Sequence, residues 1–324
     1  MFAATGARPA GEGGRRSARD ISRSLLALTQ PRIVELLLVA AIPAMLVAQR
    51  GLPPIRVVLV TLAAGALAAG SANTINCYID HRTGAVGRRI ARLPPTGNGK
   101  LPVIKPAETL AFGIVLGAAA TVLLGLLANW LSAALADAAI LLFVFICTLR
   151  LKRGSPSGFV IGGAVGCFPV LVGWSAVTGT LSFLAIVMFA VIFCWMPPRL
   201  WALAMEFRGD TAAAQVPMPG VIGSAAADAG AGKVLWYSCV MVAATLGLAP
   251  YGGWVYTLCA VALGAWFLAE AHRLRARAGH ISGSAPITVS GGAASPMGLL
   301  DLSIACLAQL FAVIMAVTLL PRSR

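Results

Sequence analysis

The chain has 324 residues, of which 59% are hydrophobic and 11% are charged, and its mean hydropathy is +0.86. This composition excludes a soluble globular domain and predicts an integral membrane protein. The net charge of +14 does not indicate a nucleic-acid-binding protein, because the basic residues are divided among segments between apolar spans and are not interleaved with stacking aromatic residues.

The first residues form a basic tail. Residues 1–26 contain several arginines but no apolar core, so they do not read as a cleavable signal peptide. We expect a disordered cytoplasmic tail over 1–26 and a single transmembrane domain over 27–324.

Apolar stretches of about 17 to 25 residues are long enough to cross a bilayer as helices. The sequence contains about nine of them, near 32–49, 56–77, 107–128, 131–149, 158–178, 182–203, 234–252, 254–271 and 298–320. The predicted fold class is therefore an all-α integral membrane protein with about nine transmembrane helices.

The basic residues predict the orientation of these spans. With the N-terminus in the cytoplasm, 21 of the 25 lysines and arginines fall in cytoplasmic segments. The exceptions are Arg50, Arg56, Arg322 and Arg324. This asymmetry is typical of a multi-pass protein of the cell (inner) membrane with a cytoplasmic N-terminus.

The most informative stretch is Ser71-Ala-Asn-Thr-Ile-Asn-Cys-Tyr-Ile-Asp80, at the end of the second span. Asn76 and Asp80 are four residues apart and therefore lie on one helical face. An amide oxygen and a carboxylate one turn apart suit Mg²⁺, which in turn suits phosphate oxygens. A basic run follows and could bind the same anion, through Arg82, Arg88, Arg89 and Arg92. The alternative is that the acid and amide only cap the helix and the arginines only anchor it.

Two further basic residues are candidates at the same membrane face. Arg32 lies one turn before Glu35 in the first span, so it either forms a structural ion pair or points into a cytoplasmic cavity. Lys152, in the short loop after the fourth span, either fixes topology or reaches an anion.

The sixth span contains Pro197 and Pro198, which we expect to bend or unwind the helix within the membrane. Irregular backbone at that depth is tolerated where it lines a cavity. Trp195, Arg199 and Trp201 are candidates to line such a cavity, although tryptophans near a helix end more often form an interfacial belt. In the long loop that follows, Asp210 is the second candidate cation ligand.

The remaining polar residues favour structural roles. We expect Asp137 to be a helix-packing or interfacial acid, and His272 and His280 to be solvated residues of a cytoplasmic loop. The seven cysteines lie in or beside apolar spans without metal-ligand spacing, which favours small core residues.

These motifs together resemble the protohaem IX farnesyltransferase (haem O synthase) family of UbiA-type intramembrane prenyltransferases, from about Leu28 to the C-terminus. The stretches that carry the resemblance are Leu28-Thr-Gln-Pro-Arg-Ile-Val-Glu-Leu-Leu-Leu, Ala72-Asn-Thr-Ile-Asn-Cys-Tyr-Ile-Asp80, Leu151-Lys-Arg, Gly162-Gly-Ala-Val-Gly-Cys-Phe-Pro-Val-Leu-Val-Gly-Trp-Ser-Ala-Val-Thr-Gly179, Pro197-Pro-Arg-Leu-Trp-Ala-Leu-Ala204 and Val216-Pro-Met218.

The resemblance implies a UbiA-like helix bundle around a central cavity open to the cytoplasmic side. It implies that farnesyl diphosphate binds through Mg²⁺ to two acidic motifs, represented by Asn76 with Asp80 and by Asp210, and that the allylic cation alkylates a vinyl group of haem b to give haem O. Asp80 and Asp210 would be the catalytic residues. Haem A synthase or oxidase assembly factors are the implied protein partners, beside the lipid bilayer.

The chain departs from the family pattern at several of these positions. Arg82 and Gly84 stand where the family has two further acids, Leu93 replaces an arginine, and Arg199 replaces a histidine. Extra positive charge in the first motif is expected to weaken Mg²⁺ binding and to favour direct phosphate contact. The alternatives are therefore an impaired homologue that binds haem or isoprenoid diphosphate without turnover, or a prenyltransferase with another acceptor.

Overall fold

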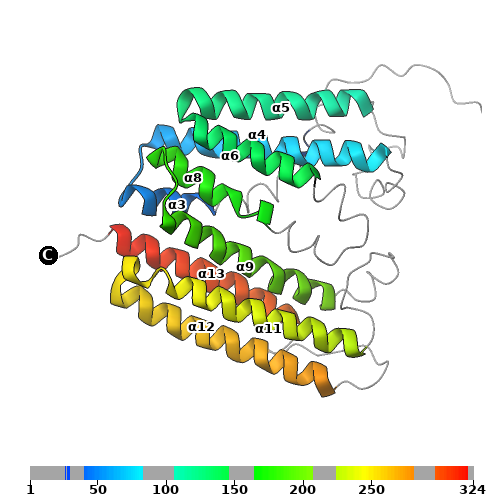
Figure 1. Ribbon diagram of the computed structural model, residues 1–324, viewed down its shortest axis with the longest axis vertical. Helices are drawn as coiled ribbons and strands as arrows, with labels where there is room; N and C mark the ends of the chain where they lie inside the picture. Colours follow the sequence, from blue (N-terminus) through cyan, green and yellow to red (C-terminus); the bar gives the residue numbers. More distant parts are fainter. Residues whose placement is uncertain are drawn as a thin grey trace, which may run out of the picture.

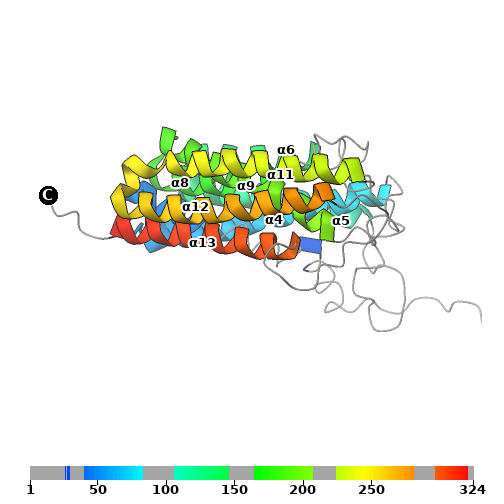
Figure 2. The ribbon, with the colours of Figure 1, turned by 90° about the horizontal axis from the view of Figure 1, so that it is seen from below.

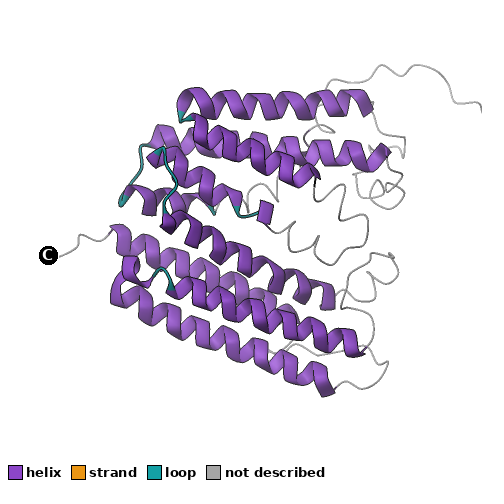
Figure 3. Ribbon diagram, viewed as in Figure 1, coloured by secondary structure: helices purple, strands orange, loops and turns teal. Residues whose placement is uncertain are grey.

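The computed structural model describes residues 26, 28–29, 40–82, 106–145, 164–206, 224–280 and 296–319. Within these residues all the regular secondary structure is helical (Figure 3), as the sequence predicts. The helices are α3 (Ala41–Gln49), α4 (Ile55–Arg82), α5 (Pro106–Leu127), α6 (Trp130–Leu142), α8 (Phe168–Thr178), α9 (Phe183–Glu206), α11 (Ser224–Leu246), α12 (Ala249–His280) and α13 (Pro296–Leu319).

Successive helices run in opposite directions, so that chain segments far apart in sequence meet at each end of the bundle. Figure 1 shows α4, α9 and α12 ending at the right of the molecule, where α5, α11 and α13 begin. The view from below in Figure 2 keeps the same arrangement. We call this end the loop end. The connections from α4 to α5, from α9 to α11 and from α12 to α13, all predicted to be cytoplasmic, begin and end at the loop end.

Three described segments are apolar and long enough to cross a membrane, namely Ile55–Ile79, Ala107–Leu127 and Ala249–Ala276. Five shorter apolar helical segments accompany them within the described residues, at Trp130–Phe145, Phe168–Thr178, Phe183–Pro198, Gly232–Leu246 and Leu302–Thr318. The hydropathy pattern therefore locates the described helices correctly and differs mainly at their ends.

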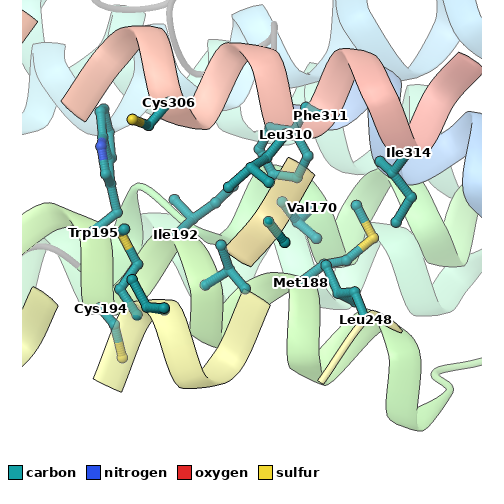
Figure 4. Packing of buried hydrophobic residues seen from close by; sticks show 14 of the residues in the cluster. Val170, Met188, Ile192, Cys194, Trp195, Leu248, Cys306, Leu310, Phe311 and Ile314 are labelled. Atoms are coloured by element: carbon teal, nitrogen blue, oxygen red, sulfur yellow. The ribbon is translucent and has the colours of Figure 1, made fainter. Parts of the chain in front are cut away.

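The helices pack as two groups that meet along α8. Small residues of α4, α5 and α6 form one buried cluster, which includes Ala64, Ala120 and Ala133. A larger cluster joins α3, α8, α9, α11, α12 and α13. Figure 4 shows its interior, where Trp195 of α9 lies beside Cys306 of α13. The indole Nε1–H of Trp195 donates to the carbonyl of Ser303 at 3.0 Å, which joins α9 to α13.

The corner between α11 and α12 differs from the predicted boundary. The sequence predicts one span ending at residue 252 and the next beginning at 254, whereas α11 ends at Leu246 and α12 begins at Ala249. Gly253 nevertheless has non-helical angles, with φ 70° and ψ −170°, a conformation that glycine adopts readily. The hydroxyl of Tyr256 donates to the carbonyl of Thr245 at 3.1 Å and closes the corner.

The end of α12 at the loop end also differs from the prediction. His272 and Arg273 belong to α12, which continues to His280, and not to a loop. Alanine, leucine and arginine are good helix formers, so the helix extends beyond the apolar stretch that hydropathy detects.

Candidate functional site

The polar end of α4 carries the first candidate motif. The helix continues through Asp80 to Arg82, so Asn76 and Asp80 lie one turn apart on one face, as predicted. Asn73 is three residues before Asn76 and seven before Asp80, which places all three positions within an arc of about 60°. This line of amide, amide and acid, Asn73, Asn76 and Asp80, is called the polar face of α4 below.

The side of α4 away from this face packs closely on α5. The Ser71 hydroxyl donates to the carbonyl of Gly113 at 2.7 Å in a buried hydrogen bond. A Cβ at Gly113 would come within 2.7 Å of Ile75 Cγ1, and one at Gly117 within 2.9 Å of Ser71 Oγ. The two backbones can approach only because both α5 positions are glycine, and this contact fixes how α4 presents its polar face.

An N-terminal segment docks on α4 beside the polar face. The side-chain amide of Asn73 donates to the main-chain carbonyl of Thr29 at 3.0 Å. The Thr29 hydroxyl donates in turn to the carbonyl of Leu26 at 2.7 Å. A Cβ at Gly70 would lie 3.2 Å from Thr29 Cγ2 and 3.3 Å from Thr29 Cβ, so the threonine rests against the glycine. Asn73 is 8% exposed.

The sequence analysis did not identify Asn73 as a functional residue. The signal was its spacing, because a second amide at i−3 from Asn76 inside an apolar helix continues the polar face. Its partner, Thr29, lies 44 positions earlier and could not be found from spacing.

The sixth span behaves differently from the prediction. α9 is helical from Phe183 to Glu206 with Pro197 and Pro198 inside it, so the predicted unwinding does not occur. Arg199 and Trp201 are therefore in the last turns of a continuous helix at the loop end. Trp195 is 6% exposed and packs against α13, which is a core position and not an interfacial one.

Several candidate site residues have no described side chain. Helical backbone alone is described for Asp80, Arg82, Arg199 and Trp201. The remaining candidates lie outside the described residues, namely Arg32, Arg88, Arg89, Arg92, Lys152 and Asp210. Helices α4 and α9, which bear these motifs, both end at the loop end.

The predicted packing role of Asp137 is confirmed. Thr121 Oγ1 of α5 donates to Asp137 Oδ1 of α6 at 2.7 Å, so the acid joins two helices. The cysteine prediction is confirmed for Cys167, Cys194 and Cys306, which are buried, whereas Cys239 is exposed on the surface of α11.

A comparison with protein-family models matches residues 37–282 to the model described as "UbiA prenyltransferase family". The chain belongs to the UbiA prenyltransferase family. Among curated UbiA relatives, it is 50% identical over 301 residues to a protoheme IX farnesyltransferase of Frankia casuarinae, covering 92% of this chain and 98% of that protein. It is also 50% identical over 305 residues to the protoheme IX farnesyltransferase of a Parafrankia strain, covering 94% and 92% of the two chains.

Solved structures show the same fold. A solved structure of digeranylgeranylglyceryl phosphate synthase superposes with a TM-score of 0.68 at 14% identity, covering 93% of this chain and 97% of that one. A UbiA homologue from Archaeoglobus fulgidus bound to DMAPP and Mg²⁺ superposes with a TM-score of 0.59 at 15% identity, covering 91% and 99%. At these identities the likeness establishes the UbiA fold alone.

The donor chemistry on α4 suits the divalent metal seen in that UbiA homologue. Amide and carboxylate oxygens are the hard ligands that Mg²⁺ prefers, and Asn76 and Asp80 supply one of each on one face. Among the residues with described side chains, no three or more histidine, cysteine, aspartate or glutamate side chains lie close enough together to hold a metal ion. A complete site would therefore need ligands beyond them, such as Asp210 or substrate oxygens.

Proposed function

We propose that this protein transfers the farnesyl group of farnesyl diphosphate to a vinyl group of haem b and so makes haem O. The observation that carries the proposal is the 50% identity to protoheme IX farnesyltransferases over more than nine-tenths of both chains. Relatives from other genera with that name are 42% to 46% identical over most of this chain. The polar face of α4 supplies a place for the reaction.

In this proposal the polar motifs hold the diphosphate at the loop end of the bundle. Asn76, Asp80 and Asp210 are the metal ligands, and Mg²⁺ would stabilise the departing diphosphate. The other anion- and substrate-binding residues are Arg32, Arg82, Arg88, Arg89, Arg92, Lys152, Arg199 and Trp201. The diphosphate leaves with the bonding electrons, and the allylic cation takes the π electrons of the haem vinyl group to form a carbon–carbon bond. The apolar interior keeps water from the allylic cation until that bond has formed. Water then adds to the cation left on the former vinyl carbon beside the porphyrin ring and releases a proton, so that the product carries a hydroxyl group there.

The domain and its setting complete the proposal. Residues 27–324 act as one transmembrane domain in the cell membrane, with the loop end and the N-terminus in the cytoplasm. Haem A synthase or oxidase assembly factors would receive the product.

A second candidate function is favoured by Arg82 and Gly84, which stand where the family has acids. Exchange of a carboxylate for a guanidinium reverses the local charge. A guanidinium also cannot bridge phosphate oxygens to protein oxygens as Mg²⁺ does. In that case the protein binds haem or an isoprenoid diphosphate without turnover, or uses another acceptor.

One experiment separates the two functions. The chain is expressed in a host that lacks haem O synthase, and haems are extracted from its membranes for chromatography and mass analysis. We expect haem O with the unchanged chain, and a loss on the order of a hundredfold or more with Asp80→Ala, because a group that stabilises the departing charge is removed. Asp137→Asn is the matched control, since this acid only packs α5 against α6, and it should leave haem O unchanged.

A different result would support binding without turnover. No haem O would form from the unchanged chain, while Arg82→Asp combined with Gly84→Asp would restore it. Haem O from the unchanged chain that is insensitive to Asp80→Ala would contradict the assigned site.

A further inference from the structure

We propose that Asn73 is a positioning residue that fastens the segment at Thr29 onto α4 and so closes the inner end of the polar face. The inference rests on the proposed function, because it assigns a wall to the prenyl diphosphate site. The segment and the helix are joined by the hydrogen bond from Asn73 Nδ2 to the Thr29 carbonyl, 3.0 Å long.

The contact lies close to the candidate ligands along the helix axis. A helix rises 1.5 Å per residue, so Asn73 is about 4.5 Å from the level of Asn76 and about 10 Å from that of Asp80. Because the three positions share one face, whatever covers Asn73 limits how far a ligand can extend inward along α4. The element that covers it is the chain at Thr29.

Two independent features make this a fitted contact. First, Asn73 is 8% exposed and its side-chain amide donates to a main-chain carbonyl, so Asn73→Ala would remove a hydrogen bond made from a buried position. Second, Gly70, one turn inward, gives the space in which Thr29 rests, with its Cγ2 only 3.2 Å from the position of a glycine Cβ. A bulkier residue at Gly70 would push the segment away.

The geometry gives a direct test of the docking. The Cβ of Thr29 lies 3.3 Å from an ideal Cβ at Gly70, close to the separation of about 3.5–4.5 Å in disulfides. The double variant Thr29→Cys/Gly70→Cys should therefore cross-link in membranes under mild oxidation, detected by mass mapping of the joined peptides. The pair Thr29→Cys/Gly232→Cys is the control and should not cross-link, because no heavy atom beyond its own local backbone lies within 4 Å of a Cβ at Gly232.

The effect on the site is measured by kinetics. We expect Asn73→Ala to raise KM for farnesyl diphosphate about three- to tenfold while kcat changes less than twofold, as the loss of one neutral hydrogen bond implies. Thr74→Val is the matched control, because it removes a buried hydrogen bond of 2.7 Å that stays within α4. It should leave KM unchanged.

A compensating pair distinguishes positioning from general damage. Gly70→Ala should raise KM in the same way, and adding Thr29→Ser should reverse much of the rise, because serine lacks the Cγ2 methyl group but keeps the hydroxyl that donates to Leu26. A merely structural defect at Gly70 would not be relieved by that change.

The possible results are distinguishable. Cross-linking with KM sensitive at Asn73 and Gly70 supports the proposal, and cross-linked protein should remain active. Failure to cross-link, equal effects of Thr74→Val, or loss of turnover on cross-linking would overturn it. If the unchanged chain makes no haem O, the proposed function fails, and the dissociation constant for farnesyl diphosphate replaces KM. Absence of both turnover and binding would overturn both proposals.

Discussion

Glu270 is a buried acid that no candidate site uses. It is 1% exposed, on the face of α12 that also buries Phe267, Ala271 and Leu274. One carboxylate oxygen, Oε2, accepts from Arg273 Nη1 at 3.2 Å, while the other, Oε1, is buried with no hydrogen-bond partner. A buried polar atom in this condition destabilises the fold by roughly 1–3 kcal/mol.

We therefore expect Glu270→Met to stabilise the protein. Methionine has a similar length, fills the same space and removes the unpartnered oxygen, while the exposed Arg273 remains solvated. The midpoint of thermal unfolding in detergent should rise by a few degrees. Glu270→Gln keeps buried polar atoms and should gain less. A fall of the midpoint with Glu270→Met would show that the carboxylate makes a net stabilising contribution.

At the scale of helices, the contact between α4 and α5 determines how the polar face is presented. A Cβ at Gly113 would meet Ile75 Cγ1 at 2.7 Å, a distance at which the Ile75 side chain or one of the two helices must shift. Ile75 lies one residue before Asn76, so the displacement would be transmitted to the candidate ligands. Overpacking of this kind typically costs about 1–3 kcal/mol.

We expect Gly113→Ala to lower haem O formation about tenfold, in line with the cost of overpacking, and Gly113→Ala/Ile75→Ala to recover most of it. The assay is haem extraction from membranes containing equal amounts of protein. Gly232→Ala is the matched control in an open helical position and should have no effect on haem O. An equal loss of haem O formation in the single and double variants would show that the close approach of α4 and α5 does not determine activity.

The sequence predicts these helices more reliably than their contacts. The length of the apolar stretch and the spacing of Asn76 and Asp80 were sufficient to predict α4 and the shared face of these two residues, because helix geometry is local. The contact between Asn73 and Thr29 depends on how two distant segments align, which no local pattern specifies. The unwinding predicted at Pro197 and Pro198 does not occur, because local propensity is overridden by packing, here including the hydrogen bond from Trp195 to α13, whereas a bend at the prolines stays a prediction.

At the scale of the whole molecule, the two ends of the bundle differ in charge. Among the described residues, Arg82, Lys233 and Arg273 belong to the loop end, whereas Arg50 and Arg56 flank the opposite connection between α3 and α4. Two of the basic segments outside the described residues, 83–105 and 207–223, connect helices whose ends lie at the loop end, whereas Arg322 and Arg324 follow the opposite end of α13. This distribution favours a cytoplasmic loop end.

Cysteine labelling tests that orientation. Leu52, in the connection between α3 and α4, is 78% exposed, and Ala276 is exposed on α12 toward the loop end. A membrane-impermeant maleimide should label Leu52→Cys in intact cells and Ala276→Cys only after the membrane is opened. The reverse pattern would place the loop end outside the cell.

The continuous helix through Pro197 and Pro198 has a mechanical consequence for the bundle. Each proline lacks an N–H, so the carbonyls of Phe193 and Cys194 have no donor four residues later in α9. Two successive missing hydrogen bonds lower the bending stiffness of α9 near the core residue Trp195, while the hydrogen bond to Ser303 keeps that level attached to α13. Bending of α9 about this attached point would move its last turns, with Arg199 and Trp201, relative to α4. Such bending would change the separation of the two motif-bearing helix ends without repacking of the core.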